Sequence, residues 1–316
     1  MTVPSSALEV LRSAALCYLG APSPRGPHVT PVVYAVDRQR LWATISRGTV
    51  KAAAWRRTPQ AAGMVRGPAG ALTFRGRVTL YDALDPFTWP AVAFRAVQLA
   101  RASARFTLRN ARFFAGYARD ARRVPLAWTP PGRIVVSVEL DAGAVLEGTE
   151  VAEMWGPWED GIAPAERFSA SSTASFPDGR LPDGLDELLR PPTDAAVGVD
   201  GPSGPVVLPA RWTRLGGTYL AAVARAGLEL SGAGPRAVAA LVIDRASAWR
   251  AAEMSGILLR GPADVVVPGR LGSGERSLAS LLQGLAVQPG DAAVLRLRPH
   301  SAVWWKGWSS GTVDRP

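Results

Sequence analysis

The sequence is poor in the residues that build disulfide frameworks and metal centres. Its 316 residues include one cysteine, Cys17, and two histidines, His28 and His300. A single cysteine excludes an internal disulfide, and this small set cannot furnish the four ligands of a usual structural zinc site. No metal site is therefore expected.

Long apolar runs are missing as well. The short apolar stretch from Ala14 to Leu19 has no basic leader before it, and Pro22 and Pro24 follow closely. No run approaches the roughly 20 apolar residues that a membrane-spanning helix needs. Together with the absence of disulfides, this predicts a cytoplasmic protein with no signal peptide and no integral membrane segment.

Lysine is scarce, although the chain is strongly basic. Lys51 and Lys306 are the only lysines, yet Lys and Arg number 36 against 26 Asp and Glu, for a formal net charge of +10. Clustered lysines and arginines are typical of nucleic-acid binding. Here the arginines are scattered through both halves and form no basic tail, so we expect no nucleic-acid partner.

Apolar residues make up 47% of the chain, enough for the cores of two domains. The first part alternates between strand-like and short helical patterns. Val-, Thr- and Tyr-rich segments favour strands, whereas the segments without alternation favour helices. Helices are expected at 5–12 and 48–57, and strands at 16–19, 29–36, 41–46, 61–65, 71–81 and 134–146.

The segment from Asp85 to Arg123 interrupts the strand pattern. It has no glycine before Gly116, and Phe and Leu residues alternate with arginines, among them Arg95, Arg101, Arg105, Arg109, Arg112 and Arg119. The pattern predicts a helical insertion that covers a barrel with its arginines outward. The alternative is a basic amphipathic surface for anionic lipid or a protein partner.

An internal repeat indicates that the barrel is duplicated. Gly26-Pro27 and Pro31 recur as Gly204-Pro205 and Pro209, each 178 residues later (204 − 26 and 209 − 31), and the same shift places Tyr34 on Trp212 and Arg47 on Arg225. Further matches pair Leu72–Gly76 with Ile257–Gly261, and Val138–Gly148 with Leu297–Gly307.

These matches predict a mainly β (α+β) fold with two similar domains in tandem and a helical insertion in the first; the family resemblance described below implies that each domain is a split β-barrel. The expected domains are residues 1–165 with the insertion at 85–123, a Ser-, Pro- and Gly-rich linker at 166–200, and a second, degenerate barrel at 201–316.

A candidate anion site lies at the end of the strand 41–46. Its side chains alternate, so Thr44 and Ser46 share a face with Trp42. Arg47 and Lys51 follow, four residues apart, where a helix begins. Hydroxyls, two cations and free backbone N–H groups at a helix N-terminus suit a phosphate. The alternative is a solvated helix start that Ser46 caps.

The segment Gly26–Val65 resembles the core motif of the flavin- and deazaflavin-binding split-barrel proteins of the pyridoxamine 5'-phosphate oxidase-like class. The similarity comprises a strand pair, a hydroxyl-bearing strand end, a lysine and an Arg-Arg-x-Pro helix end. The family usually has Asn-Leu before Arg-Arg, where this chain has Ala54-Trp55. This departure removes a side-chain hydrogen bond near the cofactor and introduces a bulky ring.

The resemblance implies a cofactor, FMN or alternatively the deazaflavin coenzyme F-420 or haem, and a set of residues that bind it. The backbone of the strand 29–33 would line the flavin ring, and Arg75 would border the pocket. The implied cofactor-binding residues are Val29, Thr30, Pro31, Val32, Thr44, Ser46, Arg47, Lys51, Arg57 and Arg75. No catalytic side chain is identified.

Proteins of this class generally dimerise and build each site from both subunits. Here the second repeat would act as the other subunit, giving a pseudo-dimer within one chain that can also pair as a homodimer, and Trp304, Trp305 or Trp308 would complete the site. At the shift of 178 the second copy has Ala222, Ala224, Arg225 and Glu229, and a carboxylate there would repel phosphate. The second site is therefore expected to be lost.

Three functions fit the sequence. The first is a flavin- or deazaflavin-dependent oxidoreductase that transfers hydride to a small organic acceptor. The second is a non-catalytic flavin, deazaflavin or haem carrier or sensor, with His28 as a candidate haem ligand or proton donor. The third is a cofactor-free protein whose helical insertion binds a partner or a membrane.

Overall fold

The structure is a computed structural model. It describes residues 2–120, 122, 124–125, 128–159, 161, 163, 176–190, 193–215, 217–245, 250–268 and 289–315. Within them no helix is long and apolar enough to cross a membrane. Of the linker predicted at 166–200, residues 166–175, 191 and 192 lie outside these residues.

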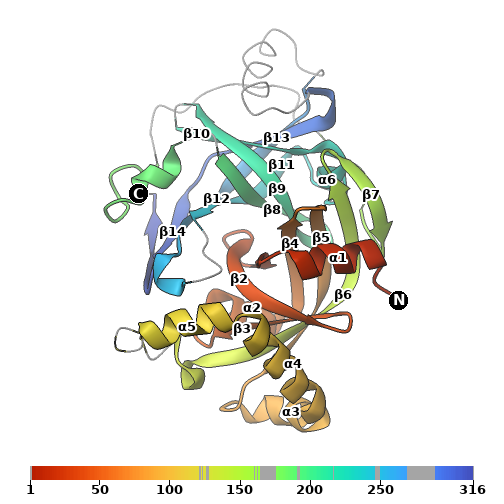
Figure 1. The fold of residues 1–316 in the computed structure, drawn as a ribbon. Coiled ribbons are helices and arrows are strands. Elements are labelled where there is room, and N and C mark those ends of the chain that lie inside the picture. The colour runs from red at the N-terminus through yellow and green to blue at the C-terminus, as the bar shows by residue number, and fades with distance from the viewer. Residues whose placement is uncertain are drawn as a thin grey trace.

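Six antiparallel strands of the first half close into a barrel. Their order is β3-β2-β1-β4-β5-β6, and closure follows because β6 also pairs with β3 (Figure 1). The helices α1 (Ser5–Ser13) and α2 (Val50–Arg57) pack on this barrel. The strands are β1 (Leu16–Ala21), β2 (His28–Asp37), β3 (Arg40–Ser46), β4 (Gln60–Gly67), β5 (Gly70–Tyr81) and β6 (Arg133–Glu147), with β7 (Glu150–Trp155) beside β6.

Side-chain alternation on β3 follows the predicted pattern. Leu41, Ala43 and Ile45 belong to the core of the first barrel. Trp42 lies on the opposite face and is buried against the helical insertion, where its ring stacks on Tyr81 with centroids 5.5 Å apart. The polar face is therefore covered near its middle and remains available for binding only toward the strand end.

The second half closes a further six-stranded barrel, so the predicted tandem architecture is confirmed. Its order is β11-β8-β9-β10-β13-β12, with β12 returning to β11. The short helix α6 (Arg225–Glu229) follows β10. The strands are β8 (Thr193–Gly201), β9 (Gly204–Leu215), β10 (Thr218–Ala224), β11 (Arg236–Arg245), β12 (Ser255–Val266), β13 (Ala292–Leu297), β14 (Ser301–Lys306) and β15 (Ser309–Asp314).

The sequence repeats fall on equivalent structural positions. Gly26 and Gly204 have positive φ angles of 95° and 102°, Gly26 in the turn before β2 and Gly204 as the first residue of β9. Gly148 and Gly307 likewise have φ angles of 62° and 58° at the turns that follow β6 and β14. Only glycine adopts this conformation without strain, so the turns account for these repeats.

The division of the chain at 165 and 200 stays a prediction, but one segment needs correction. Strand β8 (Thr193–Gly201) falls within the range expected to be linker, yet it pairs with both β9 and β11. The second barrel therefore begins at least eight residues before the predicted start at 201 (201 − 193). Closure of a barrel requires this strand, and the sequence repeat began only at Gly204.

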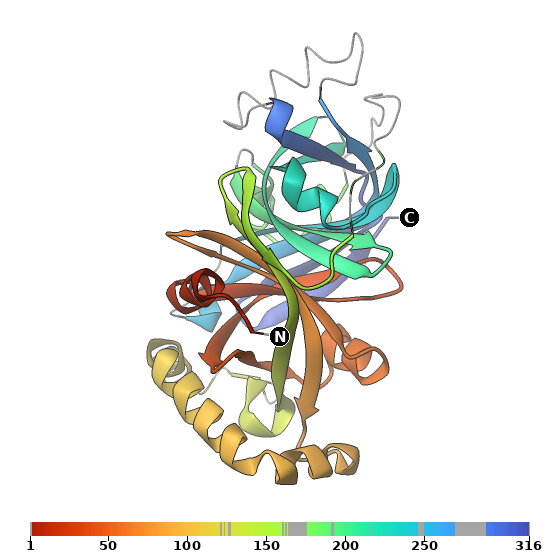
Figure 2. The ribbon, with the colours of Figure 1, turned by 90° about the vertical axis from the view of Figure 1, so that its right-hand side faces the viewer.

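The two barrels pack against each other through an apolar layer and several polar contacts. Val29, Met64 and Val207 belong to a buried cluster formed by both barrels. The Thr73 hydroxyl donates to the backbone oxygen of Val207 over 2.7 Å, and the Tyr18 hydroxyl donates to Asp244 over 3.0 Å. The barrels thus bury a shared surface, as expected of a pseudo-dimer (Figure 2).

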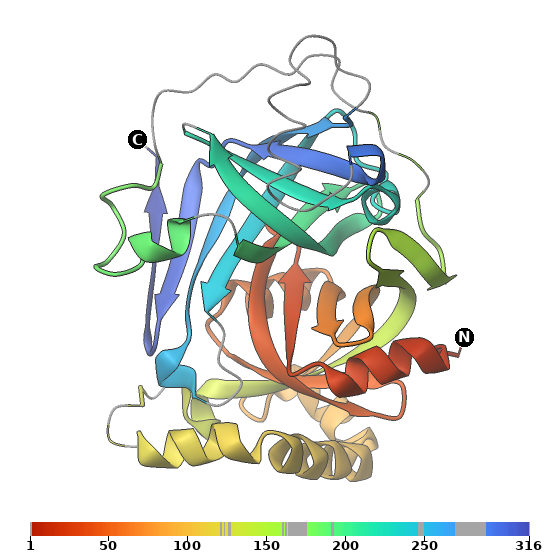
Figure 3. The ribbon, with the colours of Figure 1, turned by 45° about the horizontal axis from the view of Figure 1, so that its top comes forward.

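The helical insertion lies between β5 and β6. Most of it covers the side of the first barrel away from the second (Figures 1 and 3), but its last helix reaches the second half of the chain, where Asp120 pairs with Arg250 over 3.0 Å. It comprises η1 (Pro86–Thr88), α3 (Trp89–Phe94), α4 (Ala96–Arg109) and α5 (Ala111–Arg119). Helix α4 packs on β2 and buries Ala102 and Phe106. The predicted insertion over a barrel is therefore confirmed.

Several of its arginines bond to groups of the barrel, although Arg105 and Arg109 are exposed as predicted. Asp37 on β2 is fully buried, and Arg101 and Arg105 of α4 both form ion pairs with it. Arg109 donates to the Ala14 carbonyl over 2.6 Å. A buried carboxylate needs charged partners, and Arg101 and Arg105 supply them to Asp37 from the surface of the insertion.

Candidate functional site

A cavity opens where β2 and β3 separate. The two strands pair only from Tyr34 to Asp37 on β2. Residues 28–33 of β2 pair with β1 on one edge. All of β3 pairs with β6 on its other edge, and its end, Thr44 to Ser46, does not pair with β2. One edge of β2 is thus left without a strand neighbour, and its backbone groups are available to a ligand.

The cavity has a volume of about 410 Å³, within the range of small-molecule sites. The first barrel and the insertion line one side of it, and the β14–β15 hairpin of the second barrel lines the other. Of the residues predicted to bind a cofactor, the lining includes Thr30, Pro31, Val32, Thr44, Ser46 and Lys51.

Lys51 is a buried cation in the wall of this cavity. Its side chain is 3% exposed, and Nζ donates to the Thr30 hydroxyl over 2.7 Å and to the Thr30 carbonyl over 3.3 Å. Among the described residues no carboxylate pairs with it. Burial lowers the pKa of Lys51 to about 7, because the charged form is poorly solvated there. An anion in the cavity would supply the missing countercharge.

Arg133 is a second cation without a carboxylate partner in the described part of the chain. It lies opposite Ser46 in the β3–β6 register. Its Nε and Nη2 donate to the Thr44 hydroxyl over 3.1 and 2.8 Å, and its guanidinium stacks over Trp128 at 5.5 Å. Burial lowers the pKa of Arg133. These contacts fix the guanidinium and leave Nη1 able to meet a ligand.

The N-terminus of α2 contributes backbone donors. Gly48, Thr49 and Val50 line the cavity at the helix start. The helix cap is Thr49, whose hydroxyl oxygen accepts from the Ala52 N–H over 3.3 Å. Ser46 is not the cap, and its carbonyl accepts the Thr49 hydroxyl over 2.8 Å. The Ser46 hydroxyl is therefore not used for capping.

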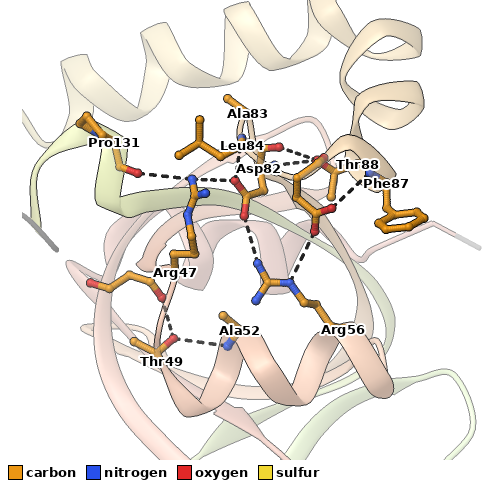
Figure 4. A network of polar contacts seen from close by, with 12 residues as sticks. Arg47, Thr49, Ala52, Arg56, Asp82, Ala83, Leu84, Phe87, Thr88 and Pro131 are labelled. Carbon is orange, nitrogen blue, oxygen red and sulfur yellow. Dashed lines mark hydrogen bonds and ion pairs between the residues drawn. The ribbon is translucent and has the colours of Figure 1, made fainter.

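Arg47 does not join Lys51, because α2 begins only at Val50 and the spacing of four does not fall within one helix. Arg47 instead pairs with the buried Asp82 over 2.7 Å, and Arg56 pairs with the same carboxylate over 3.0 Å (Figure 4). Because Arg47 pairs with Asp82, its side chain does not line the cavity.

Three further predicted residues lie outside the lining. Val29 is fully buried in the layer between the barrels. Arg57 is exposed on the outer side of α2. Arg75 stacks over Trp158 at 4.9 Å, at the β-bulge between β5 and β6. The structure therefore brings together the hydroxyl residues and Lys51, but not these three residues.

The far wall comes from the second barrel, as the pseudo-dimer prediction requires. Trp304 and Trp305 of β14 line the cavity. Trp308 instead packs edge-on against Tyr117 and Trp128, with centroids 5.0 and 5.4 Å away. The second barrel has no matching unpaired cation at the equivalent place, because Arg225 pairs with Glu229 over 3.0 Å.

His28 lines the cavity at the start of β2. Its Nδ1 is buried without a hydrogen-bond partner among the described residues. Burial, together with the charges of Lys51 and Arg260, lowers the pKa of His28 to about 3. The imidazole is therefore neutral at physiological pH.

Sequence reasoning missed Arg133 and Thr49. Thr49 carried a local signal, because a threonine before a helix is a preferred cap. Arg133 carried no local signal, because its role depends on the pairing of β3 with β6. This pairing brings Arg133 to Thr44, which lies 89 residues earlier in the chain.

The fold and the site define a tandem split-barrel protein with an anion-compatible cavity between its barrels. No family model matches the chain, and no curated protein matches it. Among solved structures, the chain is similar to a pyridoxamine 5'-phosphate oxidase-related, FMN-binding protein from Nostoc punctiforme (17% identity, 46% of this chain and 87% of that one, TM-score 0.34).

It is also similar to an F420 reductase (21% identity, 45% and 98% of the two chains, TM-score 0.30) and to a FAD-binding protein from Mesorhizobium loti (16%, 45% and 94%, TM-score 0.32). Each match covers less than half of this chain. What these proteins bind is a property of those proteins, and the likeness concerns the fold alone.

Proposed function

We propose that this protein is an oxidoreductase that uses a phosphate-bearing flavin, FMN or a deazaflavin, in the cavity between its barrels. The observation that carries the proposal is the presence of two cations, the buried Lys51 and the half-buried Arg133, that line one cavity without a carboxylate partner among the described residues. Buried cations are costly unless an anion offsets them.

The remaining lining fits the parts of such a cofactor. The phosphate would meet Lys51, Arg133 and the N-terminus of α2, where helix N–H groups favour anions. The ring would lie along the free edge of β2, and Trp304 and Trp305 would cover it from the second barrel. A bound flavin would supply hydride chemistry, and the protein would orient it and exclude water.

Lys51→Glu tests this assignment against a matched control. The variant places a carboxylate where the phosphate would bind, so we expect FMN binding to be abolished. Arg57→Glu makes the same charge change on the same helix, outside the cavity, and we expect it to retain the wild-type affinity. Equal loss in both variants, or in neither, would contradict the site.

His28 favours haem binding as a second candidate function. A neutral imidazole is the form that binds haem iron, and His28 is a neutral imidazole in the cavity wall. Titration with hemin should then give a Soret band that His28→Ala removes. A band that survives this substitution would exclude His28 as the ligand.

A further inference from the structure

Large apolar side chains are exposed along the helical insertion and the turn that enters it. Of the eleven large apolar side chains that are exposed in the described part of the chain, seven lie between residues 84 and 114. The two most exposed are Phe87 and Phe94, at 95% and 89%. The other five are Leu84, Trp89, Val97, Leu108 and Phe114. Single exposed apolar residues are ordinary on a protein surface, whereas a group of this kind marks a surface that contacts another molecule.

Helix α4 is apolar on two opposite sides. Ala102 and Phe106 are buried against the first barrel. Val97 and Leu108 are exposed, and they share the other side of the helix because their separation of eleven residues is about three helical turns. A surface helix of a soluble protein ordinarily has a polar outer side. The outer side of α4 is therefore built for a partner other than water.

The short helices before α4 continue this apolar side. Phe87 lies on η1 and Phe94 on α3, and α3 contacts both η1 and α4. These helices lie at the end of the molecule opposite the second barrel (Figure 2). The exposed side of residues 84–108 is called the outer face below.

The surroundings of the outer face are positively charged. Residues 85–119 contain six arginines and a single carboxylate, Asp85, for a net charge of +5 (6 − 1). Asp37 of the barrel pairs with both Arg101 and Arg105, so it neutralises only one of these charges. Arg119 is exposed. The outer face thus combines protruding apolar side chains with an excess of cations.

This combination fits an anionic lipid membrane better than it fits a second copy of the chain or a nucleic acid. In a dimer through this face, two segments of charge +5 would repel each other. A nucleic acid could stack on the aromatic rings, but it would leave the aliphatic Leu84, Val97 and Leu108 in water. A fluid bilayer accepts protruding side chains without a preformed pocket, and its anionic headgroups attract arginine.

We propose that the outer face binds an anionic lipid membrane peripherally. Phe87 and Phe94 insert among the acyl chains, Trp89 lies at the level of the headgroups, and the arginines of the insertion meet lipid phosphates. The insertion can cover the barrel and bind lipid at the same time, because the two contacts use opposite sides of α4. This inference does not depend on the proposed function.

The double variant Phe87→Ser/Phe94→Ser tests the inserted side chains. Both phenylalanines are almost completely exposed, so their removal should leave the fold and the charge of the protein unchanged. The matched control is Met154→Ser/Leu215→Ser, which removes two exposed apolar side chains outside the insertion, 53% and 38% exposed. Equal thermal unfolding of the three proteins verifies that the fold is intact.

Co-sedimentation with vesicles measures the binding. The wild-type protein should bind vesicles of phosphatidylcholine and phosphatidylserine in equal parts roughly tenfold or more tightly than vesicles of phosphatidylcholine alone, and added salt should weaken this binding. The double variant should bind roughly tenfold or more weakly than the wild type, because two phenylalanines no longer leave water. The control variant should bind as the wild type does.

Three results would overturn the inference: no binding to the mixed vesicles, equal binding to both kinds of vesicle, or a double variant that binds as tightly as the control. A wild-type dimer that the double variant dissociates, seen by sedimentation velocity, would assign the outer face to a second copy and likewise overturn it. FMN affinity should be the same in all three proteins, so failure of the flavin proposal and failure of the lipid inference are separate outcomes.

Discussion

Lys51→Met should stabilise the flavin-free protein while weakening FMN binding. Burial lowers the pKa of Lys51 from 10.5 to about 7. One pKa unit corresponds to about 1.36 kcal/mol, so burial disfavours the charged form by about 4–5 kcal/mol. Methionine has a similar shape and no charge. It loses the hydrogen bonds to Thr30, worth about 1–3 kcal/mol for a charged donor. The net gain should be about 1–4 kcal/mol near neutral pH.

The sign of the pH dependence gives a second check. Above the unfolded pKa of 10.5, Lys51 is neutral in both states and carries no charge penalty. Between about 7 and 10.5 the unfolded chain binds a proton that the folded chain does not, so the wild-type stability gains from rising pH. Below about pH 7 Lys51 is charged in both states, so the full free-energy cost of burying its charge remains. The advantage of Lys51→Met should therefore be largest at or below neutral pH and shrink toward pH 10.

Thermal unfolding of both flavin-free proteins across this pH range measures the effect, and the difference between the two proteins cancels the titration of other groups. FMN affinity should fall roughly 10- to 100-fold in the variant, because it loses a charge-assisted hydrogen bond. A variant that is no more stable than the wild type, or whose advantage does not change with pH, would refute the burial of an uncompensated ammonium at this position.

Three further outcomes follow from the same contacts. FMN affinity should be highest near pH 6–7, because the phosphate loses its second proton near 6 and Lys51 loses its own above about 7; a flat titration profile would contradict this. Arg133→Gln should weaken FMN binding by roughly 10- to 100-fold with little change in riboflavin binding, as followed by flavin fluorescence. Asp37→Asn should destabilise the protein by about 2–4 kcal/mol and speed trypsin cleavage at the arginines of α4, because Arg101 and Arg105 lose their buried partner; unchanged cleavage would mean that other contacts hold the insertion.

Local patterns in the sequence predicted much of the first barrel. The alternation of β3, the positive-φ glycines at the turns and the helix before Thr58-Pro59 depend on neighbouring residues, and their predicted ranges differ from the observed ones by a few residues at most. The duplication was predictable because the same turns recur in the second half.

The site was predictable only in part, because charge partners come from distant segments. Lys51 and Thr44 line the cavity as the strand and helix patterns indicated. The positions of Arg47 and Arg101 depend on Asp82 and Asp37, which pair with them across the fold. Arg133 lies in the site through strand pairing. No local pattern carries this information.

The most direct test of the anion site compares FMN with riboflavin, which differ by the phosphate alone. The wild-type protein should bind FMN at least tenfold more tightly, and Lys51→Met should remove most of this preference while leaving riboflavin affinity nearly unchanged. Equal affinity of the wild-type protein for the two flavins would contradict the claim that Lys51 and Arg133 form a phosphate site.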